Sequence, residues 1–75
     1  MERYANRSGD SGVSGYEIGS NYIWVEFTTG SVYEYTYSSA GSANVETMKG
    51  LATNGSGLNS FINKTVKFKY SRKIR

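Results

Sequence analysis

The chain has 75 residues, a net charge of +3, and neither cysteine nor histidine. It is long enough for one small domain, and its composition excludes a disulfide framework and any zinc site built from cysteine or histidine. It has no apolar run near the roughly 20 residues of a membrane helix, and no apolar stretch typical of a secretory signal follows Met1–Tyr4. We therefore expect a cytoplasmic protein with no cofactor, no metal and no membrane partner.

The charge is distributed unevenly along the chain. Residues 1–63 contain three basic and six acidic side chains, whereas residues 64–75 contain six basic side chains and no acidic one. A mildly acidic body thus carries a strongly basic C-terminal segment. Such a split is the strongest functional clue in the composition, because clustered lysine and arginine attract polyanions.

The first part of the chain is polar and has no hydrophobic period. Residues 1–12 are therefore predicted to form a flexible N-terminal arm, residues 13–70 a single domain, and residues 71–75 a mobile basic tail. Within the domain, Val13–Gly19 predicts a first strand, and Gly19–Asn21 supplies a turn into the next one.

Residues 23–37 have the pattern of a β-hairpin, with two alternating segments around Thr28-Thr29-Gly30. A two-residue loop would force the β-branched Thr29 to positive φ, whereas a three-residue loop needs positive φ only at Gly30. The three-residue loop sets Val25 opposite Tyr33. One sheet face then carries Ile23, Val25, Phe27, Tyr33, Tyr35 and Tyr37, and the other carries Tyr22, Trp24, Glu26, Val32, Glu34 and Thr36.

A meander of three strands is marginal alone and needs a cover over its apolar face. After a loop at residues 38–41, two apolar stripes at helical spacing supply that cover: Val45, Met48, Leu51 and Ala52, then Leu58, Phe61, Ile62 and Val66. Ser42 or Asn44 can cap the first helix, Gly50 predicts that it is short or closely packed there, and Asn54-Gly55 ends it.

The second helix is expected to start near residues 56–57 and to end near residues 64–66. The following residues alternate as in a strand, so residues 66–70 are compatible with either helix or strand. The fold class predicted from these elements is α+β, a three-stranded antiparallel meander with two C-terminal helices packed on one face.

The order of these elements resembles the KTSC family, small bacterial and phage domains named after a C-terminal module of some lysyl-tRNA synthetases. The similarity runs from Ser14 to Tyr70, with the strand Ile23/Val25/Phe27, Gly30, the Tyr33-Glu34-Tyr35 motif, the Leu51–Gly57 joint, the Gly57–Asn63 run, Val66 and Tyr70. It implies the same fold and an RNA-binding role. The chain contains no synthetase domain, so no synthetase-linked role is implied.

The basic C-terminal segment is the leading candidate site. Charged and aromatic side chains interleave there, as in surfaces that contact phosphates and stack unpaired bases. The predicted nucleic-acid-binding residues are Lys64, Lys67, Lys69, Tyr70, Arg72 and Lys73. The alternatives are a solubilising tail beyond a packed helix or a non-specific attractor of polyanions, with Phe68 and Tyr70 completing the core.

Two further sites are predicted. Trp24 and Tyr22 lie on the sheet face away from the helices, which favours a protein partner or a homodimer there, unless the arm covers them through Tyr4. A weak anion site for phosphate or a nucleotide is predicted at the glycine-rich helix N-terminus, at Gly55, Ser56, Gly57 and Asn59, although helix capping explains this loop better.

We do not expect an enzyme. Glu26 and Glu34 share the outer sheet face, where paired carboxylates remain solvated and lack a cleft, and the serines have no histidine base. The sequence therefore predicts a small non-catalytic binding module for RNA or another polyanion. Protein interaction or self-association through Trp24, and nucleotide capture at residues 55–59, are the alternatives.

Overall fold

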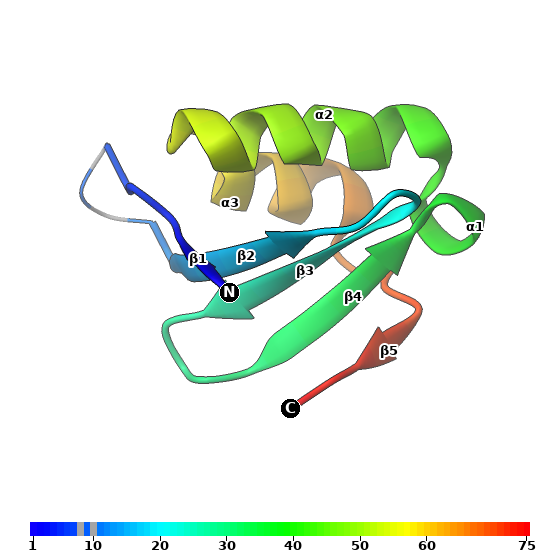
Figure 1. The fold of residues 1–75 in the computed structure, drawn as a ribbon, viewed down its shortest axis with the longest axis horizontal. Coiled ribbons are helices and arrows are strands. Elements are labelled where there is room, and N and C mark those ends of the chain that lie inside the picture. The colour runs from blue at the N-terminus through cyan, green and yellow to red at the C-terminus, as the bar shows by residue number, and fades with distance from the viewer. Residues whose placement is uncertain (8, 10) are drawn as a thin grey trace.

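The computed structural model describes residues 1–7, 9 and 11–75, which build one antiparallel sheet and a helical layer (Figure 1). Five strands lie in sequence order: β1 (Glu2–Arg3), β2 (Val13–Ile18), β3 (Tyr22–Phe27), β4 (Val32–Thr36) and β5 (Arg72–Lys73). The helices are α1 (Tyr37–Ala40), α2 (Ser42–Asn54) and α3 (Leu58–Phe61), and α3 continues into the π-helical segment η1 (Ile62–Val66). Figure 1 shows α2 and α3 on the same side of the sheet.

The predicted α+β class and the antiparallel sheet are confirmed, but the predicted strand and helix numbers are wrong. The described sheet has five strands instead of three, because the segments predicted as a flexible arm and a mobile tail contribute β1 and β5. Each of these strands has only two residues, and both residues are exposed. Such short, exposed strands carry no hydrophobic alternation from which they could have been predicted.

The predicted hairpin register is confirmed. Val25 lies opposite Tyr33 and Ile23 lies opposite Tyr35. The turn is closed by the Phe27 N–H, which donates to the Ser31 carbonyl at 2.8 Å, and by the Gly30 N–H, which donates to the Phe27 carbonyl at 2.8 Å. Gly30 has φ of +95°, a conformation that favours glycine. The turn therefore fixes which side chains face the helices.

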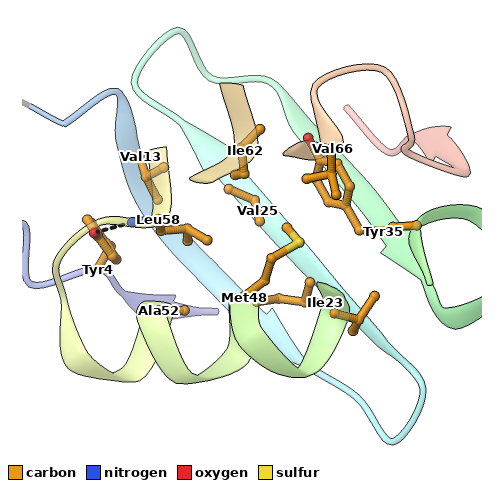
Figure 2. Packing of buried hydrophobic residues seen from close by; sticks show 12 residues of the cluster. Tyr4, Val13, Ile23, Val25, Tyr35, Met48, Ala52, Leu58, Ile62 and Val66 are labelled. Atoms are coloured by element: carbon orange, nitrogen blue, oxygen red, sulfur yellow. Dashed lines mark hydrogen bonds between the residues drawn. The ribbon is translucent and has the colours of Figure 1, made fainter. Parts of the chain in front are cut away.

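The core lies between the sheet and the helices (Figure 2). Ile23, Val25 and Tyr35 enter it from the sheet, and the two predicted helical stripes close it with Val45, Met48, Ala52, Leu58, Ile62 and Val66, all buried. The prediction that Gly50 makes the first helix short or closely packed is wrong. Helix α2 has 13 residues, and a β-carbon at Gly50 would have no neighbour within 4 Å.

The N-terminal arm is part of the core. Tyr4 is only 4% exposed, and its hydroxyl oxygen accepts a hydrogen bond from the Leu58 N–H at 3.3 Å, drawn as a dashed line in Figure 2. The Tyr4 N–H donates to the Ser14 carbonyl at 3.1 Å. The prediction of a flexible arm over residues 1–12 is therefore wrong for its first residues. The sequence could not show this burial, because a single aromatic residue has no periodic apolar neighbours.

The connection between sheet and helices also differs from the prediction. The segment predicted as a loop forms the short helix α1, whose first turn is closed reciprocally by Thr36 and Ser39: each backbone N–H donates to the other's hydroxyl at 3.0 Å. Neither Ser42 nor Asn44 caps α2, which begins after Gly41 without a side-chain cap. Tyr37, predicted on the hairpin face that the helices cover, instead belongs to α1 and is exposed.

Candidate functional site

The structure divides the basic C-terminal segment between the two sides of the sheet. On the outer face, opposite the helices, Arg72 pairs with Glu34 at 3.2 Å and Arg75 pairs with Glu26 at 2.6 Å. The chain there is also held by its backbone, because the Ile74 N–H donates to the Val32 carbonyl at 2.7 Å. Val32, on the same face, is fully buried. The two arginines thus bind the two outer-face acids of the hairpin and stabilise the fold.

Glu34 is the centre of this outer-face network. Its carboxylate accepts hydrogen bonds from the Ser71 hydroxyl at 2.6 Å and from Trp24 Nε1 at 2.9 Å, in addition to the Arg72 ion pair. These hydrogen bonds, with that of Ser71 the strongest cause, hold the pKa of Glu34 below its ordinary value despite some burial. The charged carboxylate therefore fastens β5 to the edge of β4.

This network gives an expected pH dependence. Because the pKa of Glu34 is lowered in the folded state, its charged form stabilises the protein above the ordinary pKa of 4.5, and that stabilisation is lost as pH falls through the lowered folded-state value. The urea midpoint of the wild type should exceed that of Glu34→Gln at pH 7, and the difference should shrink progressively below pH 4.5. A difference that stays constant down to pH 3 would contradict this role for the carboxylate.

On the helix side, residues 67–70 close a small cleft rich in aromatic rings, which we call the aromatic cleft. It has a volume of about 280 Å³ and lies between the sheet, η1 and the segment after η1. Its walls are formed by Phe27, Tyr33, Tyr35, Ile62, Asn63, Lys67, Phe68 and Tyr70. No acidic residue lines it.

The rings of this cleft differ strongly in exposure. Tyr35 is buried at its base, where burial and the neighbouring Tyr33 and Tyr70 raise its pKa to about 12, so that its hydroxyl stays neutral. Tyr70 packs on Tyr33 with 4.7 Å between ring centroids and is 39% exposed. Phe68 is 80% exposed at the rim. The cleft is therefore a built aromatic surface that remains open to solvent.

Lysines surround this surface. Lys67 lines the cleft, with its ammonium 5.5 Å from the Phe68 ring centroid, and Lys73 lies directly opposite Tyr33 in the β4–β5 register, so both side chains share one sheet face. Lys64 on η1 and Lys69 after it are exposed. Within the described part of the chain, none of these four lysines forms an ion pair. Their charge is available to a ligand.

The structure therefore regroups the predicted nucleic-acid-binding residues. Lys67 and Tyr70 line the aromatic cleft, Lys73 stands beside Tyr33, and Lys64 and Lys69 flank the same segment, whereas Arg72 lies on the outer face with Glu34. Asn63 and Phe68 were not among the predicted nucleic-acid-binding residues, but Asn63 lines the cleft and Phe68 is exposed at its rim. Strand-like alternation from Val66 suggested that Phe68 could join the core, but the chain turns at residues 67–68 and redirects its side chain.

Trp24 and Tyr22 lie on the outer face, as the register predicts. Their rings contact one another at 5.8 Å between centroids, and Trp24 is partly buried while its Nε1 donates to Glu34. The Tyr22 ring covers Gly19, where a β-carbon would collide with it. Tyr4 does not cover Trp24, because Tyr4 enters the core on the other side. These rings already have partners within the chain.

The glycine-rich joint serves the fold. Gly55 ends α2 with φ of +80°, and its N–H donates to the Leu51 carbonyl at 2.9 Å. The N–H of Leu58, which follows Gly57, is taken by the Tyr4 hydroxyl. Ser56 and Asn59 are partly buried. At the predicted anion site, formed by Gly55, Ser56, Gly57 and Asn59, the Leu58 N–H is therefore already hydrogen-bonded to a side chain of the protein itself. Gly55 caps the C-terminal end of α2, as the helix-capping interpretation expects.

Metal-binding clusters and membrane-spanning helices are both absent from the described residues. Among residues 1–7, 9 and 11–75, no group of three or more acidic, histidine or cysteine side chains could hold a metal ion. No helix in the same residues has both the length and the apolar character to cross a membrane.

Comparison of the chain with protein-family models, with curated proteins and with solved structures finds no match.

Proposed function

We propose that the protein is a non-catalytic binding module for nucleic acid, with RNA as the leading ligand, and that the aromatic cleft with its surrounding lysines is the binding surface. The observation that carries the proposal is the exposure of Phe68 at the rim of the cleft next to the ammonium group of Lys67. A large aromatic ring left in water beside a cleft marks a surface that a ligand covers, and the unpaired lysines select an anionic one.

The distribution of ion pairs supports the same surface. The acids Glu26 and Glu34 are paired with Arg75 and Arg72 on the outer face, so they do not neutralise the lysines on the helix side. Lysines at this density, interleaved with aromatic rings, match the combination of phosphate contacts and stacking that single-stranded nucleic acid requires. The resemblance to the KTSC family adds RNA as the expected polyanion.

Removing one lysine of this surface should weaken RNA binding and lower its salt dependence. For a single strand, each lost phosphate contact should reduce the slope of log K against log salt by about 0.7. We expect this reduction for Lys67→Ala and for Lys73→Ala. The measurement is fluorescence anisotropy with a labelled single-stranded RNA at several salt concentrations.

The matched control is Arg3→Ala. Arg3 is exposed and lies in β1, at the opposite edge of the sheet from β5, so this variant removes one positive charge away from the proposed surface. Its salt slope should equal that of the wild type. A salt slope that is the same in the wild type and in all three variants would contradict a localised binding surface. A slope that falls equally in Lys67→Ala, Lys73→Ala and Arg3→Ala would contradict it as well.

A further inference from the structure

We infer that the aromatic cleft binds one unpaired nucleobase, so that the protein distinguishes single strands from duplexes; this inference rests on the proposed function. A polyanion contact alone needs only exposed lysines. The structure adds a concave, ring-lined site among these lysines, and such a site can hold a planar ligand as well as a phosphate chain.

The size of the aromatic cleft limits the ligand that it can hold. Small-molecule pockets in proteins commonly measure about 300–1,000 Å³, and the aromatic cleft, at about 280 Å³, lies just below that range. It suits a single ring system and is too small for the edge of a duplex. A base inside a duplex is stacked on its neighbours, so only an unpaired base can enter.

The rings of the cleft are arranged as a fixed wall with one exposed ring beside it. Tyr70 packs against Tyr33 and meets the buried Tyr35 edge-on, with 6.5 Å between their ring centroids. This packing fixes Tyr70 in place although it is partly exposed. Phe68, by contrast, has most of its ring in solvent. A base that stacks on Phe68 would therefore cover an exposed ring while resting against a pre-arranged aromatic wall.

Polar and charged groups lie beside these rings. Asn63 is exposed and lines the cleft, and its amide can both donate to and accept from the edge of a base. Lys67 at the cleft and Lys73 beside Tyr33 provide charge for the phosphates on either side of that base. A ring stack, an amide and two flanking ammonium groups are the complement of one nucleotide within a strand.

The test compares three labelled RNAs with the same total number of phosphates: a single strand, the same strand with abasic sites in place of its bases, and a duplex of half the length. We expect the base-carrying single strand to bind about tenfold tighter than the abasic strand, as stacking of one or more bases on an aromatic ring would give. Phe68→Ala should remove this preference, and Phe68→Trp should retain it.

The control variant is Ile18→Ala, which removes an exposed apolar side chain outside the cleft and should keep the preference. Equal, salt-dependent binding of all three RNAs would overturn the base site while leaving the proposed polyanion function in place. Competition by polyglutamate as strong as that by the single strand would also overturn it, in favour of an acidic peptide. Absence of binding to every RNA, even at low salt, would overturn both proposals.

Discussion

Replacement of Tyr4 by alanine is expected to unfold a substantial part of the protein. Truncating a large buried aromatic side chain costs about 3–5 kcal/mol, whereas a natural domain has roughly 0.05–0.15 kcal/mol of stability per residue, or about 4–11 kcal/mol for a chain of this length. Tyr4 is buried among core side chains of β2, α2 and α3 (Figure 2). The Tyr4→Ala substitution would therefore remove a large part of the free energy of unfolding.

Two variants separate packing from hydrogen bonding at Tyr4. Tyr4→Phe keeps the ring and removes only the acceptor of the Leu58 N–H, which should cost about 1–3 kcal/mol for the buried group left unpaired. Arg3→Ala, next to it but exposed, should change stability by less than about 0.5 kcal/mol. Urea unfolding followed by far-UV circular dichroism measures all three. A Tyr4→Ala midpoint equal to that of Arg3→Ala would mean that the arm is not part of the core.

Gly55→Ala is the second large effect that we expect. At φ of +80° an L-residue is strained, at a cost of about 1–2 kcal/mol, and the added β-carbon would lie 2.5 Å from the β-carbon of Ala5. The joint between α2 and α3 and the N-terminal segment would have to separate. The loss in free energy of unfolding should therefore exceed the cost of the backbone strain alone. Adding Ala5→Gly to the Gly55→Ala variant should recover the part of this loss that is due to the collision.

Two other glycines serve as controls in the same urea experiment. Gly30 has φ of +95°, and a β-carbon there would have no neighbour within 4 Å, so Gly30→Ala should show the cost of strain without a collision. Gly50 is exposed in the middle of α2 with open space around it, so Gly50→Ala should stabilise the protein by up to about 1 kcal/mol. If Ala5→Gly brings no recovery to Gly55→Ala, the contact between the arm and the helix joint is not formed.

Much of the central fold could be predicted from sequence because local rules determine it. Gly30 is the turn residue that best tolerates positive φ, and the three-residue loop then fixes every cross-strand pair from Ile23 to Tyr35. The apolar stripes of α2 and of α3 with η1 repeat at the helical period and are buried as expected. In these segments, periodicity and turn chemistry agree, and tertiary contacts only reinforce them.

The remainder depends on contacts between segments far apart in the sequence. Tyr4 is buried because it packs against side chains of β2 and α3 and accepts a hydrogen bond from the Leu58 N–H. Strand β5 is held at the sheet edge by the ion pairs of Arg72 with Glu34 and of Arg75 with Glu26. The candidate site depends on both effects: once Arg72 is drawn to the outer face, Lys73 is left beside Tyr33. Charge counting indicated the basic segment from which the proposed surface is built, but only the sheet register shows which of its side chains face the aromatic cleft.

The most direct test of the central claim is a titration of labelled single-stranded RNA with the wild-type protein from low to physiological salt. The proposed lysine surface should give saturable binding whose log K falls against log salt with a slope of at least about 2, equivalent to three or more phosphate contacts. The Lys67→Ala/Lys73→Ala double variant should show a clearly smaller slope. Binding that is absent even at low salt, or whose slope is unchanged in the double variant, would contradict the claim.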